Sequence, residues 1–241
     1  MRKMEFSKLY LRTKETILTM INDNLFPGNK LPSEDELAKD LGVSLTTVRE
    51  ALLVLTKDGI ITKKHGIGSF VHRSALAAKM RIDIISDFID LLEDGGYDVR
   101  LVQSGYRIEP ASHEEAQNLQ VNGGDELFTY ERVFYANDIP AIWALNKIPT
   151  VYLQNQPSDK EVERTIYQFV RKYCREELVQ SILEFNPRCA TKPEKELFAL
   201  DEGTPLLAWD EVFYNIADVP ITFNRITFNP RLMKLKMLRK W

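Results

Sequence analysis

Two groups of polar and basic side chains near the start of the chain have the composition of a surface that contacts DNA. Residues 44–49 place hydroxyl groups and a guanidinium at the start of a predicted helix, and residues 63–65 (Lys-Lys-His) precede a glycine-rich turn. Threonine hydroxyls bond phosphates or bases, and arginine makes bidentate contacts with guanine or phosphate. Basic side chains in a turn suit the phosphate backbone or the minor groove. The chemistry predicted for this region is recognition of double-stranded DNA.

Helix caps and apolar spacing predict the elements that would position these groups. A first helix covers residues 8–23, and a capping box of Ser33 and Glu36 opens a second, short helix. Ser44 caps a third helix with one apolar stripe, and residues 60–71 form two strands around a glycine-rich tip. This is the pattern of a winged helix-turn-helix, whose third helix enters the major groove by its first turn. The residues expected to face outward are Leu45, Thr46, Thr47 and Arg49.

Charge separates this region from the rest of the chain. Residues 1–75 carry 12 Lys and Arg against 9 Asp and Glu, a net charge of +3, while the whole chain carries −3. A basic DNA-binding domain on an acidic body fits this asymmetry. The alternative is a plain helical fold whose basic cluster is a solvated turn; helix-turn-helix, wing and local positive charge together favour DNA binding.

Composition restricts the class of protein. The 241 residues are 44% hydrophobic and 28% charged, which is typical of a soluble globular protein with two modest domains. Neither an apolar run of about 18 residues nor a signal sequence is visible, so a cytoplasmic location and no membrane association are expected. Cys174 and Cys189 are expected to be reduced, and no metal site or cofactor is expected. The expected domains are residues 1–74 and 81–241, joined by a linker at 75–80.

The motifs of the first domain resemble the winged-helix domain of the GntR family of bacterial transcription regulators. They are Leu-Pro-Ser-Glu at 31–34, Val-Ser at 43–44, Thr-Thr-Val-Arg-Glu-Ala-Leu at 46–52 and His-Gly-Ile-Gly-Ser-Phe-Val at 65–71. The resemblance implies a homodimer that reads an inverted repeat. The residue after the cap serine is commonly Arg in the family and is Leu45 here, so the operator is expected to depart from the usual consensus. The expected DNA-binding residues are Ser33, Glu34, Ser44, Leu45, Thr46, Thr47, Arg49, Lys63, Lys64, His65, Gly66 and Gly68.

An internal repeat organises the second domain. Residues 124–149 align with residues 203–229, and each copy is predicted as a helix, a strand, a turn and a strand. Two copies suit a pseudo-symmetric antiparallel sheet with helices on one face, so the fold class is α+β. Further helices are expected at 84–94, 112–119 and 165–174, and further strands at 99–109 and 178–185.

Residues 80–230 resemble the UTRA effector-binding domain of the HutC-type branch of GntR regulators, whose fold is similar to chorismate lyase. The resemblance implies a small-molecule pocket between the two repeats and dimerisation through the sheet. Arg132 matches the family's arginine that grips an anionic group, whereas Ala144 and Thr222 stand where acids are usual. The expected effector-binding residues are Arg132, Trp143, Ala144, Asn146, Thr165, Tyr167, Thr222 and Asn224.

These residues favour one ligand class. With both acids replaced, and with Trp143 and Phe223 as candidate walls, an anion with a flat or apolar body, such as an acyl or aromatic acid, is favoured over a sugar phosphate. The second repeat carries Glu211 where the first carries Arg132, so packing of the repeat does not demand this charge. The alternative is that the aromatic residues are sheet core and that Arg132 pairs at the surface with Glu131 or Asp210.

Two functions therefore compete. The favoured one is a DNA-binding repressor modulated by a small anionic metabolite. The alternative is an enzyme with a chorismate lyase-like domain acting on a small carboxylate. Outside the first domain His113 is the one histidine, and no nucleophile elbow or phosphate loop is present in the sequence, so catalysis is not expected.

Overall fold

The computed structural model describes residues 3–84, 87–157 and 162–240. By their contacts the residues fall into two units, Met1–Ile84 with Lys236–Trp241 and Ile85–Leu235, which we call the head and the body. None of the helices in the described ranges combines the length and apolar character needed to cross a membrane.

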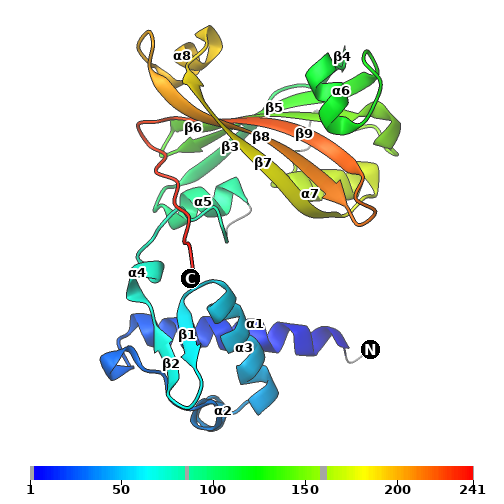
Figure 1. The fold of residues 1–241 in the computed structure, drawn as a ribbon. Helices are drawn as coiled ribbons and strands as arrows, with labels where there is room; N and C mark the ends of the chain where they lie inside the picture. The colour runs from blue at the N-terminus through cyan, green and yellow to red at the C-terminus, as the bar shows by residue number, and fades with distance from the viewer. Residues whose placement is uncertain (1–2, 85–86, 158–161, 241) are drawn as a thin grey trace. The chain divides into compact units, whose positions relative to one another are not determined.

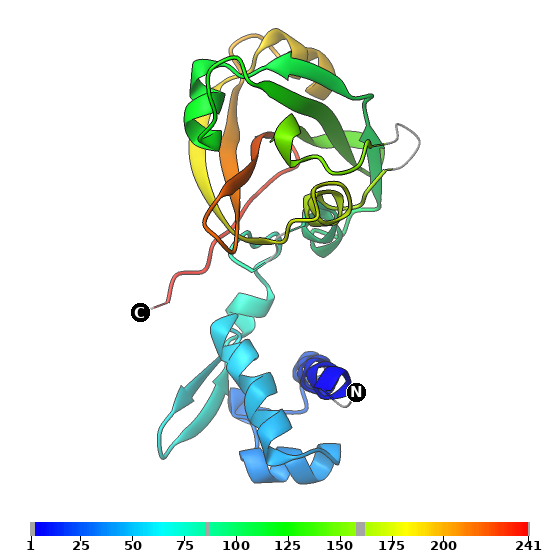
Figure 2. The same cartoon turned by 90° about the vertical axis from the view of Figure 1, so that its right-hand side faces the viewer.

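The head is a helical core with a two-stranded hairpin. Helix α3 packs against α1 and α2, and the hairpin of β1 and β2 extends from this core (Figure 2). Buried side chains from α1, α2, α3 and both strands form one apolar cluster, which includes Ile17, Leu37, Val48 and Val71. The elements are α1 (Lys3–Asn22), η1 (Pro27–Asn29), α2 (Glu34–Leu41), α3 (Leu45–Lys57), β1 (Ile61–Lys64), β2 (Gly68–Val71) and α4 (Arg73–Leu76).

The predicted caps of the helix-turn-helix are present. Ser33 accepts a hydrogen bond from the backbone N–H of Glu36, whose carboxylate accepts from the backbone N–H of Ser33 at 2.8 Å. Gly42 ends α2 with φ of 64°, a left-handed conformation that glycine adopts without steric cost. Ser44 then caps α3 by accepting from the Thr47 N–H at 3.1 Å. These local bonds end α2 and begin α3, which we call the recognition helix. Together with the β1–β2 hairpin they confirm the winged helix-turn-helix.

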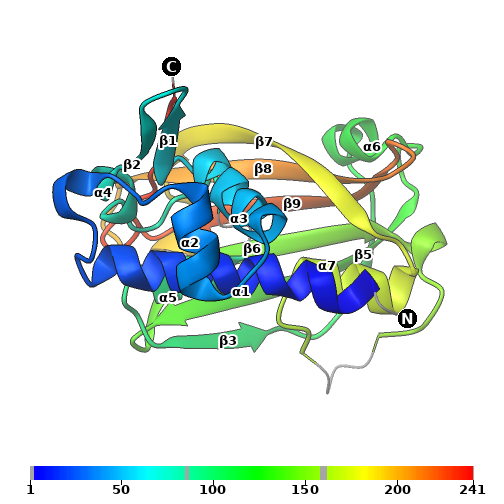
Figure 3. The same ribbon diagram turned by 90° about the horizontal axis from the view of Figure 1, so that it is seen from below.

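The body is built on one antiparallel sheet of seven strands. Their order is β3-β5-β6-β9-β8-β7, with β4 also paired to β5, so β3 and β7 end this path of strands (Figure 3). The strands are β3 (Val99–Gln103), β4 (Arg107–Pro110), β5 (Glu126–Ala136), β6 (Ile139–Pro149), β7 (Leu178–Cys189), β8 (Pro205–Asn215) and β9 (Pro220–Phe228). The helices are α5 (Phe88–Asp94), α6 (His113–Leu119), η2 (Thr150–Tyr152), α7 (Ile166–Phe169), η3 (Val170–Cys174) and α8 (Lys192–Phe198).

The internal repeat is confirmed as a pair of units, α6-β5-β6 and α8-β8-β9. Their inner strands β6 and β9 pair antiparallel, which places the two copies about a pseudo-twofold axis. Each copy has a register irregularity at the same place, between Phe134 and Tyr135 and between Phe213 and Tyr214. The fold class α+β is therefore confirmed.

Helices cover both faces of the sheet, so the expectation of helices on one face is wrong (Figure 1). Helix α7 packs on Phe128, Tyr130 and Phe213, whereas α6 packs on Leu127 and Val212. Neighbouring residues of a strand point to opposite faces, so the two helices lie on opposite sides. Phe88 of α5 lies with α7 on the first side, since its ring is 5.4 Å from that of Phe134. Each face of the sheet is therefore a separate packed layer with its own polar groups.

Candidate functional sites

The start of the recognition helix carries the residues predicted to contact DNA, with one exception. Leu45 is half-buried and Thr46 is exposed, while the side chain of Arg49 is 60% exposed. Thr47 is only 5% exposed, and its hydroxyl lies 2.8 Å from the Ser44 hydroxyl. The expectation that Thr47 faces outward is wrong, because its side chain turns back onto the helix cap.

Glu34 joins the recognition helix to the wing. Its carboxylate accepts a hydrogen bond from Arg49 Nε at 2.8 Å and pairs with Lys63 Nζ. The bonds from Arg49 and Lys63 hold the pKa of Glu34 below its ordinary value, so the group stays ionised. A carboxylate repels phosphate, which makes Glu34 a brace for two cations. Phosphate must compete with Glu34 for both of them.

The tip of the wing is exposed and shaped by glycine. Gly66 and Gly68 have φ of 72° and 125°, in the region that other residues rarely adopt. Lys64 and His65 are exposed beside them, as a backbone-contacting tip requires. Ile67 lies between the two glycines and is 56% exposed. An apolar side chain here suits insertion into the minor groove, and Ile67 is not among the residues predicted from the sequence.

Leu53 is a second residue that the sequence analysis overlooked. It is 69% exposed and lies four residues after Arg49, on the same face of α3. Apolar side chains on a recognition helix can contact the methyl group of thymine. Counting four residues onward from Arg49 would have identified it.

Replacement of Arg49 by alanine is expected to weaken specific DNA binding by about 1–3 kcal/mol, because a bidentate contact is lost. Replacement of Lys64 by alanine is expected to lower the salt dependence of DNA binding by about one phosphate contact, with little loss of specificity.

Replacement of Glu34 by glutamine should raise the affinity for all DNA sequences, since Arg49 and Lys63 then no longer pair with a carboxylate. Fluorescence anisotropy with a selected duplex at several salt concentrations measures all three. Wild-type binding by the Arg49 variant would contradict the assignment of α3.

In the body, five of the eight predicted effector residues lie on one buried face of the sheet. Arg132 is directly opposite Ala144 across the β5–β6 pair, and Asn146 is opposite Asn224 across the β6–β9 pair. Thr222 is two residues before Asn224 and donates to Asn224 Oδ1 at 2.8 Å. All five are at most 4% exposed. We call this layer, which α5 and α7 cover, the Arg132 face.

The guanidinium of Arg132 is buried with little to neutralise it. It is 4% exposed and donates from Nη2 to Asn146 Oδ1 at 3.2 Å, the one hydrogen bond it makes within the described residues. The central carbon of the guanidinium, Cζ, lies 5.4 Å from the centre of the Phe134 ring and 5.9 Å from the centre of the Tyr130 ring. The alternative of a surface pair with Glu131 or Asp210 is wrong, since both acids lie on the opposite face with other partners.

One carboxyl group of the Arg132 face belongs to α5. Asp87 caps this helix by accepting from the N–H groups of Ile89 and Asp90 at 2.9 and 3.3 Å. Burial raises the pKa of Asp87, and the positive charge of Arg132 acts in the opposite direction. Asp87 is thus close enough to Arg132 to feel its charge, although no ion pair within 4.0 Å joins them.

Four buried polar atoms lack a hydrogen-bond partner among the described residues, and all are on the Arg132 face. They are Gln103 Oε1, Tyr130 Oη, Arg132 Nε and Trp209 Nε1. Gln103 is opposite Arg132 in the β3–β5 pair. Trp209 is opposite Ile226 in the β8–β9 pair, and Ile226 is opposite Ala144 in the β6–β9 pair, so Trp209 lies on the same face. Burial raises the pKa of Tyr130, so its hydroxyl stays protonated and can donate. Trp209 Nε1 lies near the Glu211 carboxylate and acts to lower the pKa of that group. Two donors without partners, Tyr130 Oη and Arg132 Nε, therefore remain on strand β5 and suit a ligand that accepts hydrogen bonds, since each such buried atom costs about 1–3 kcal/mol.

Gln103, Tyr130 and Trp209 are not among the residues predicted from the sequence. A signal for Tyr130 was available, because it lies two residues before Arg132 on the same strand and so shares its face. Gln103 and Trp209 come from strands whose pairing is set by the fold, and spacing alone does not identify them.

The other predicted residues divide between the two sides of the sheet. Thr165 caps α7 by accepting from the Gln168 N–H at 3.1 Å, and the Tyr167 ring lies edge-on to Phe213, 5.6 Å away. Both therefore belong to the helix that covers the Arg132 face. Trp143 lies on the opposite face, opposite Val133 in the β5–β6 pair, and its Nε1 donates to Glu131 at 3.1 Å.

Trp143 and Phe223 are therefore not walls for a ligand held by Arg132. Trp143 follows Ile142 and Phe223 follows Thr222, so strand alternation sends each to the other side. There Trp143 lines a hollow of about 550 Å³ with Arg188 and Arg225. Both arginines are already paired, with Glu194 at 2.5 Å and with Asp210 at 2.8 Å.

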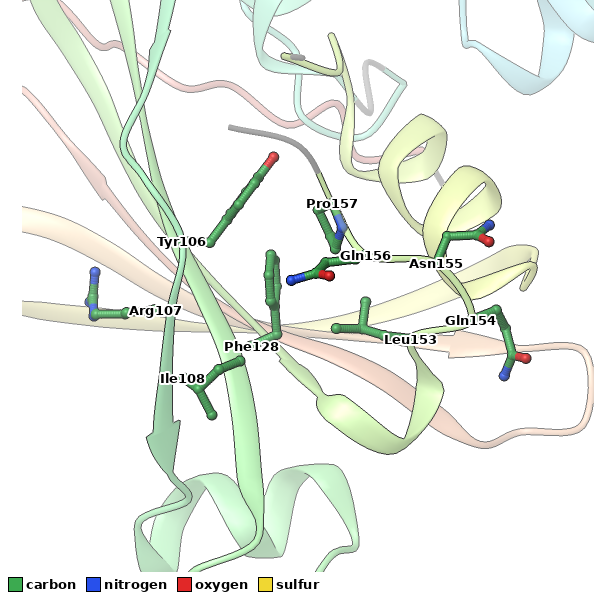
Figure 4. A pocket seen from close by; sticks show the side chains of 9 residues that line it. All are labelled: Tyr106, Arg107, Ile108, Phe128, Leu153, Gln154, Asn155, Gln156 and Pro157. Atoms are coloured by element: carbon green, nitrogen blue, oxygen red, sulfur yellow. The ribbon is translucent and has the colours of Figure 1, made fainter. Parts of the chain in front are cut away.

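A second cavity, of about 510 Å³, lies beside the Arg132 face (Figure 4). The rings of Tyr106 and Phe128 face Leu153, Gln156 and Pro157 across it. The Tyr106 ring is 5.8 Å from that of Tyr130, and Tyr106 Oη accepts from Gln103 Nε2 at 2.9 Å. Aromatic walls are thus continuous with the atoms that lack partners.

Comparison with known proteins agrees with this division. A family described as "UTRA domain" matches residues 96–234, and one described as "Bacterial regulatory proteins, gntR family" matches residues 9–71. The HTH-type transcriptional repressor NagR of Bacillus subtilis (strain 168) is 26% identical over 200 residues, covering 83% of this chain and 81% of NagR. A histidine utilization repressor of Pseudomonas aeruginosa is 32% identical over 133 residues, 55% of this chain and 52% of its own length.

Solved structures show the same fold. The crystal structure of YydK from Bacillus subtilis superposes with a TM-score of 0.79 at 22% identity, covering 96% of this chain and 99% of YydK. PhnF from Mycobacterium smegmatis superposes with a TM-score of 0.59 at 20% identity, covering 95% and 99%.

Proposed function

The chain belongs to the UTRA-domain family, joined to a gntR-family DNA-binding domain, and from this premise we propose that a small anion bound at Arg132 controls its DNA binding. The protein is a DNA-binding transcriptional regulator, and its named relatives are repressors. The head supplies the DNA contacts and the body supplies the effector site. Repression relieved by the effector is the mode that we propose.

The buried, poorly neutralised guanidinium of Arg132 is the observation that carries this proposal. A buried charge without a close counterion is costly, so a protein keeps one where a partner arrives from outside. Arg132 Nε lacks a partner within the described residues, and Tyr130 Oη shares its face with the same lack. An anion that accepts from several of these donors would offset the cost.

We further propose that the body of this anion is flat or apolar. Aromatic rings line the site: Phe134 and Tyr130 flank the guanidinium, and Tyr106 and Phe128 line the adjoining cavity. Glu211 is the one buried carboxyl that the strands contribute to the described part of the Arg132 face, and it already accepts a hydrogen bond from Ser181 Oγ at 2.7 Å. Acyl and aromatic carboxylates are therefore favoured over sugar phosphates.

A thermal-shift screen tests the site and the ligand class together. Fatty-acyl and aromatic carboxylates are compared with phosphorylated sugars, and each compound that stabilises the protein is then tested for release of a bound duplex by anisotropy. Stabilisation by carboxylates, with release of DNA, supports the proposal. Stabilisation by amino-sugar phosphates alone would contradict the ligand class.

Competition with Asp87 supplies a route from the anion to the rest of the chain. A ligand anion would replace Asp87 as the neighbour of Arg132. Asp87 and Phe88 begin α5, and the Phe88 ring contacts Phe134, Trp209 and Phe228 at 5.4 to 6.1 Å. Asp87 and Phe88 follow the last head residue, Ile84, by only a few positions in the sequence. We propose that displacing them passes the effect of the bound anion towards the head.

We also propose a homodimer that binds an inverted repeat, since one winged helix reads only a half-site. Strand β7 pairs with β8 alone among the described strands and leaves one edge of the sheet open. Val179, Ile182 and Phe185 on β7 are 52%, 66% and 42% exposed. A long edge strand with exposed apolar side chains is a template for pairing with another chain, here a second copy of the same strand.

Replacement of Ile182 by aspartate is therefore expected to produce a monomer, because it places a charge on the paired edges. Light scattering should give twice the chain mass of 27.9 kDa for the wild type and a single chain mass for the variant. The matched control is Ile216→Asp, since Ile216 is 89% exposed in the turn before β9 and should leave the mass unchanged. A dimeric Ile182 variant would refute β7 as the interface.

We propose finally that the chain acts in the cytoplasm, where its operator lies, and that the body binds its ligand without turning it over. The competing function is an enzyme acting on a small carboxylate. A turnover assay with chorismate-like substrates separates the two, and product formation would refute the regulator-only function.

A further inference from the structure

The last described residues of the chain return to the head and pair with it. We call residues 236–240 the strap. Its Lys236 N–H donates to Met80 O, and the Ile82 N–H donates to Lys236 O, both at 3.0 Å. These bonds form a parallel bridge between Arg81 and Lys236. The strap therefore runs beside residues 80–82, which lead out of the head.

The strap also covers the C-terminal end of the recognition helix. Leu238 packs on Gly59, where a side-chain carbon would collide with Leu238 Cδ2. Gly59 has φ of 71°, a conformation that favours glycine, and the absence of a side chain there leaves room for Leu238. Lys240 Nζ donates to Lys57 O and, at 3.4 Å, to Thr56 O. Carbonyls at a helix C-terminus lack partners within the helix, and a cation there is favourable.

Arg81 ties the strap, the outgoing chain and the helix together. It is 2% exposed, and its Nη1 donates to Asp58 O, at the end of α3, at 2.8 Å. Its Nε and Nη2 donate to the two carboxylate oxygens of Asp83 at 3.1 and 2.5 Å. Asp83 Oδ1 in turn accepts from the Leu238 N–H at 3.4 Å. Each of the three guanidinium nitrogens of this buried arginine therefore donates a hydrogen bond, so Arg81 joins these segments through specific contacts.

The covalent path makes this connection informative. The chain passes from head to body between residues 84 and 87 and comes back between residues 235 and 236. On the head side both crossings lead to residues that are bonded to the C-terminal end of α3, Arg81 in one segment and Lys240 in the other.

We propose that the strap is a second tether, by which the body positions the recognition helix. Arg81, Leu238 and Lys240 are positioning residues for DNA binding, although none of them lies on the DNA-contacting turn of α3. The inference rests on the proposed regulation of the head by the body, and it adds the path by which that regulation reaches α3.

Two variants of the full chain separate a tether from a mere cover. The first ends at Leu235 and lacks the strap, and the second inserts Gly-Ser-Gly-Ser between Leu235 and Lys236. The insertion leaves every strap contact within the head available but makes the tether slack. Lys240→Ala is compared with Lys234→Ala, because Lys234 is exposed and makes no described contact.

Hydrogen exchange without and with a duplex selected by the wild-type chain is the measurement. In the truncated chain the amides of Gly59 and Ile60 should exchange at least about tenfold faster, because the end of α3 is uncovered. Lys240→Ala should change exchange there in the same direction, and Lys234→Ala should not. Unchanged exchange in the truncated chain would overturn the docking of the strap.

The insertion variant decides the tether. In the wild type, binding of the duplex should change exchange in α5 of the body, since coupling between two sites is reciprocal. The insertion variant should bind the duplex with an affinity within about threefold of the wild type but show a smaller change in α5. A change of equal size would overturn the tether. If the wild type shows no change, head and body are uncoupled, which overturns the inference, whereas ligand binding at Arg132 is judged separately by thermal shift.

Discussion

Replacement of Arg132 by methionine is expected to stabilise the protein and to abolish its response to anions. The guanidinium is 4% exposed and has one hydrogen bond at 3.2 Å within the described residues, so its burial is not offset. Replacing a buried charge by an apolar side chain of similar volume often gains about 1–4 kcal/mol. A gain of about 1–2 kcal/mol would raise the melting temperature by roughly 2–8 °C. DNA affinity without an effector should be unchanged.

Arg188→Met is the matched control for this prediction. Arg188 is an arginine of the sheet on the opposite face, where its side chain is 31% exposed and is paired with both carboxylate oxygens of the buried Glu194 at 2.5 and 2.6 Å. Its loss leaves Glu194 buried without a counterion and should destabilise the body by about 3–5 kcal/mol. Scanning calorimetry and the anion screen measure both variants. A destabilised Arg132 variant that still responds to anions would identify Arg132 as a structural residue.

Acidification is expected to remove the stabilisation that Glu194 provides. Glu194 is 2% exposed, and although burial acts to raise its pKa, bonds from Arg188, Thr191 and Thr227 lower it to about 2. The unfolded chain, where the pKa is near 4.5, then takes up the proton more readily than the folded one. The contribution is therefore complete above pH 4.5 and is lost as the pH falls towards 2. Its size is on the order of 3 kcal/mol.

Urea unfolding followed by tryptophan fluorescence between pH 3 and 7 measures this loss. Glu194→Gln should lower the free energy of unfolding at pH 7 and flatten its dependence on pH below 4.5. Glu202→Gln is the control, since Glu202 pairs with Lys195 but its side chain is 92% exposed, and it should behave like the wild type. An unchanged pH profile in the Glu194 variant would show that another group causes the acid loss.

Local patterns were sufficient to predict most elements of both units, although residues 99–109, expected as one strand, form the two strands β3 and β4. Ser33 and Ser44 are side chains that cap helices within three residues, and Gly42 takes a conformation that glycine favours. The repeat in the body was visible because each copy carries its own strands and turn. Such features depend on neighbours in the chain, so the order of residues alone determined them.

Burial and the sharing of a face were decided only by the tertiary structure. Arg132 and Ala144 share a face through pairing of β5 with β6, whereas Trp143, one residue away from Ala144, lies on the other side. The four polar atoms without partners come from three strands, and no local spacing links Gln103 to Trp209. Thr47 has the residue type of a DNA contact, but packing at the helix cap buries it.

The return of the strap to the head is the clearest case of this difference. Leu238 packs on Gly59, and Lys240 bonds the end of α3, although more than 170 residues separate them. The sequence by itself determined the helices, the wing, the repeat and the class of DNA-binding regulator, because caps, turns and strand alternation act over a few residues. Which buried charge lacks a counterion, and where the end of the chain docks, depend on contacts that form only when distant segments pack together.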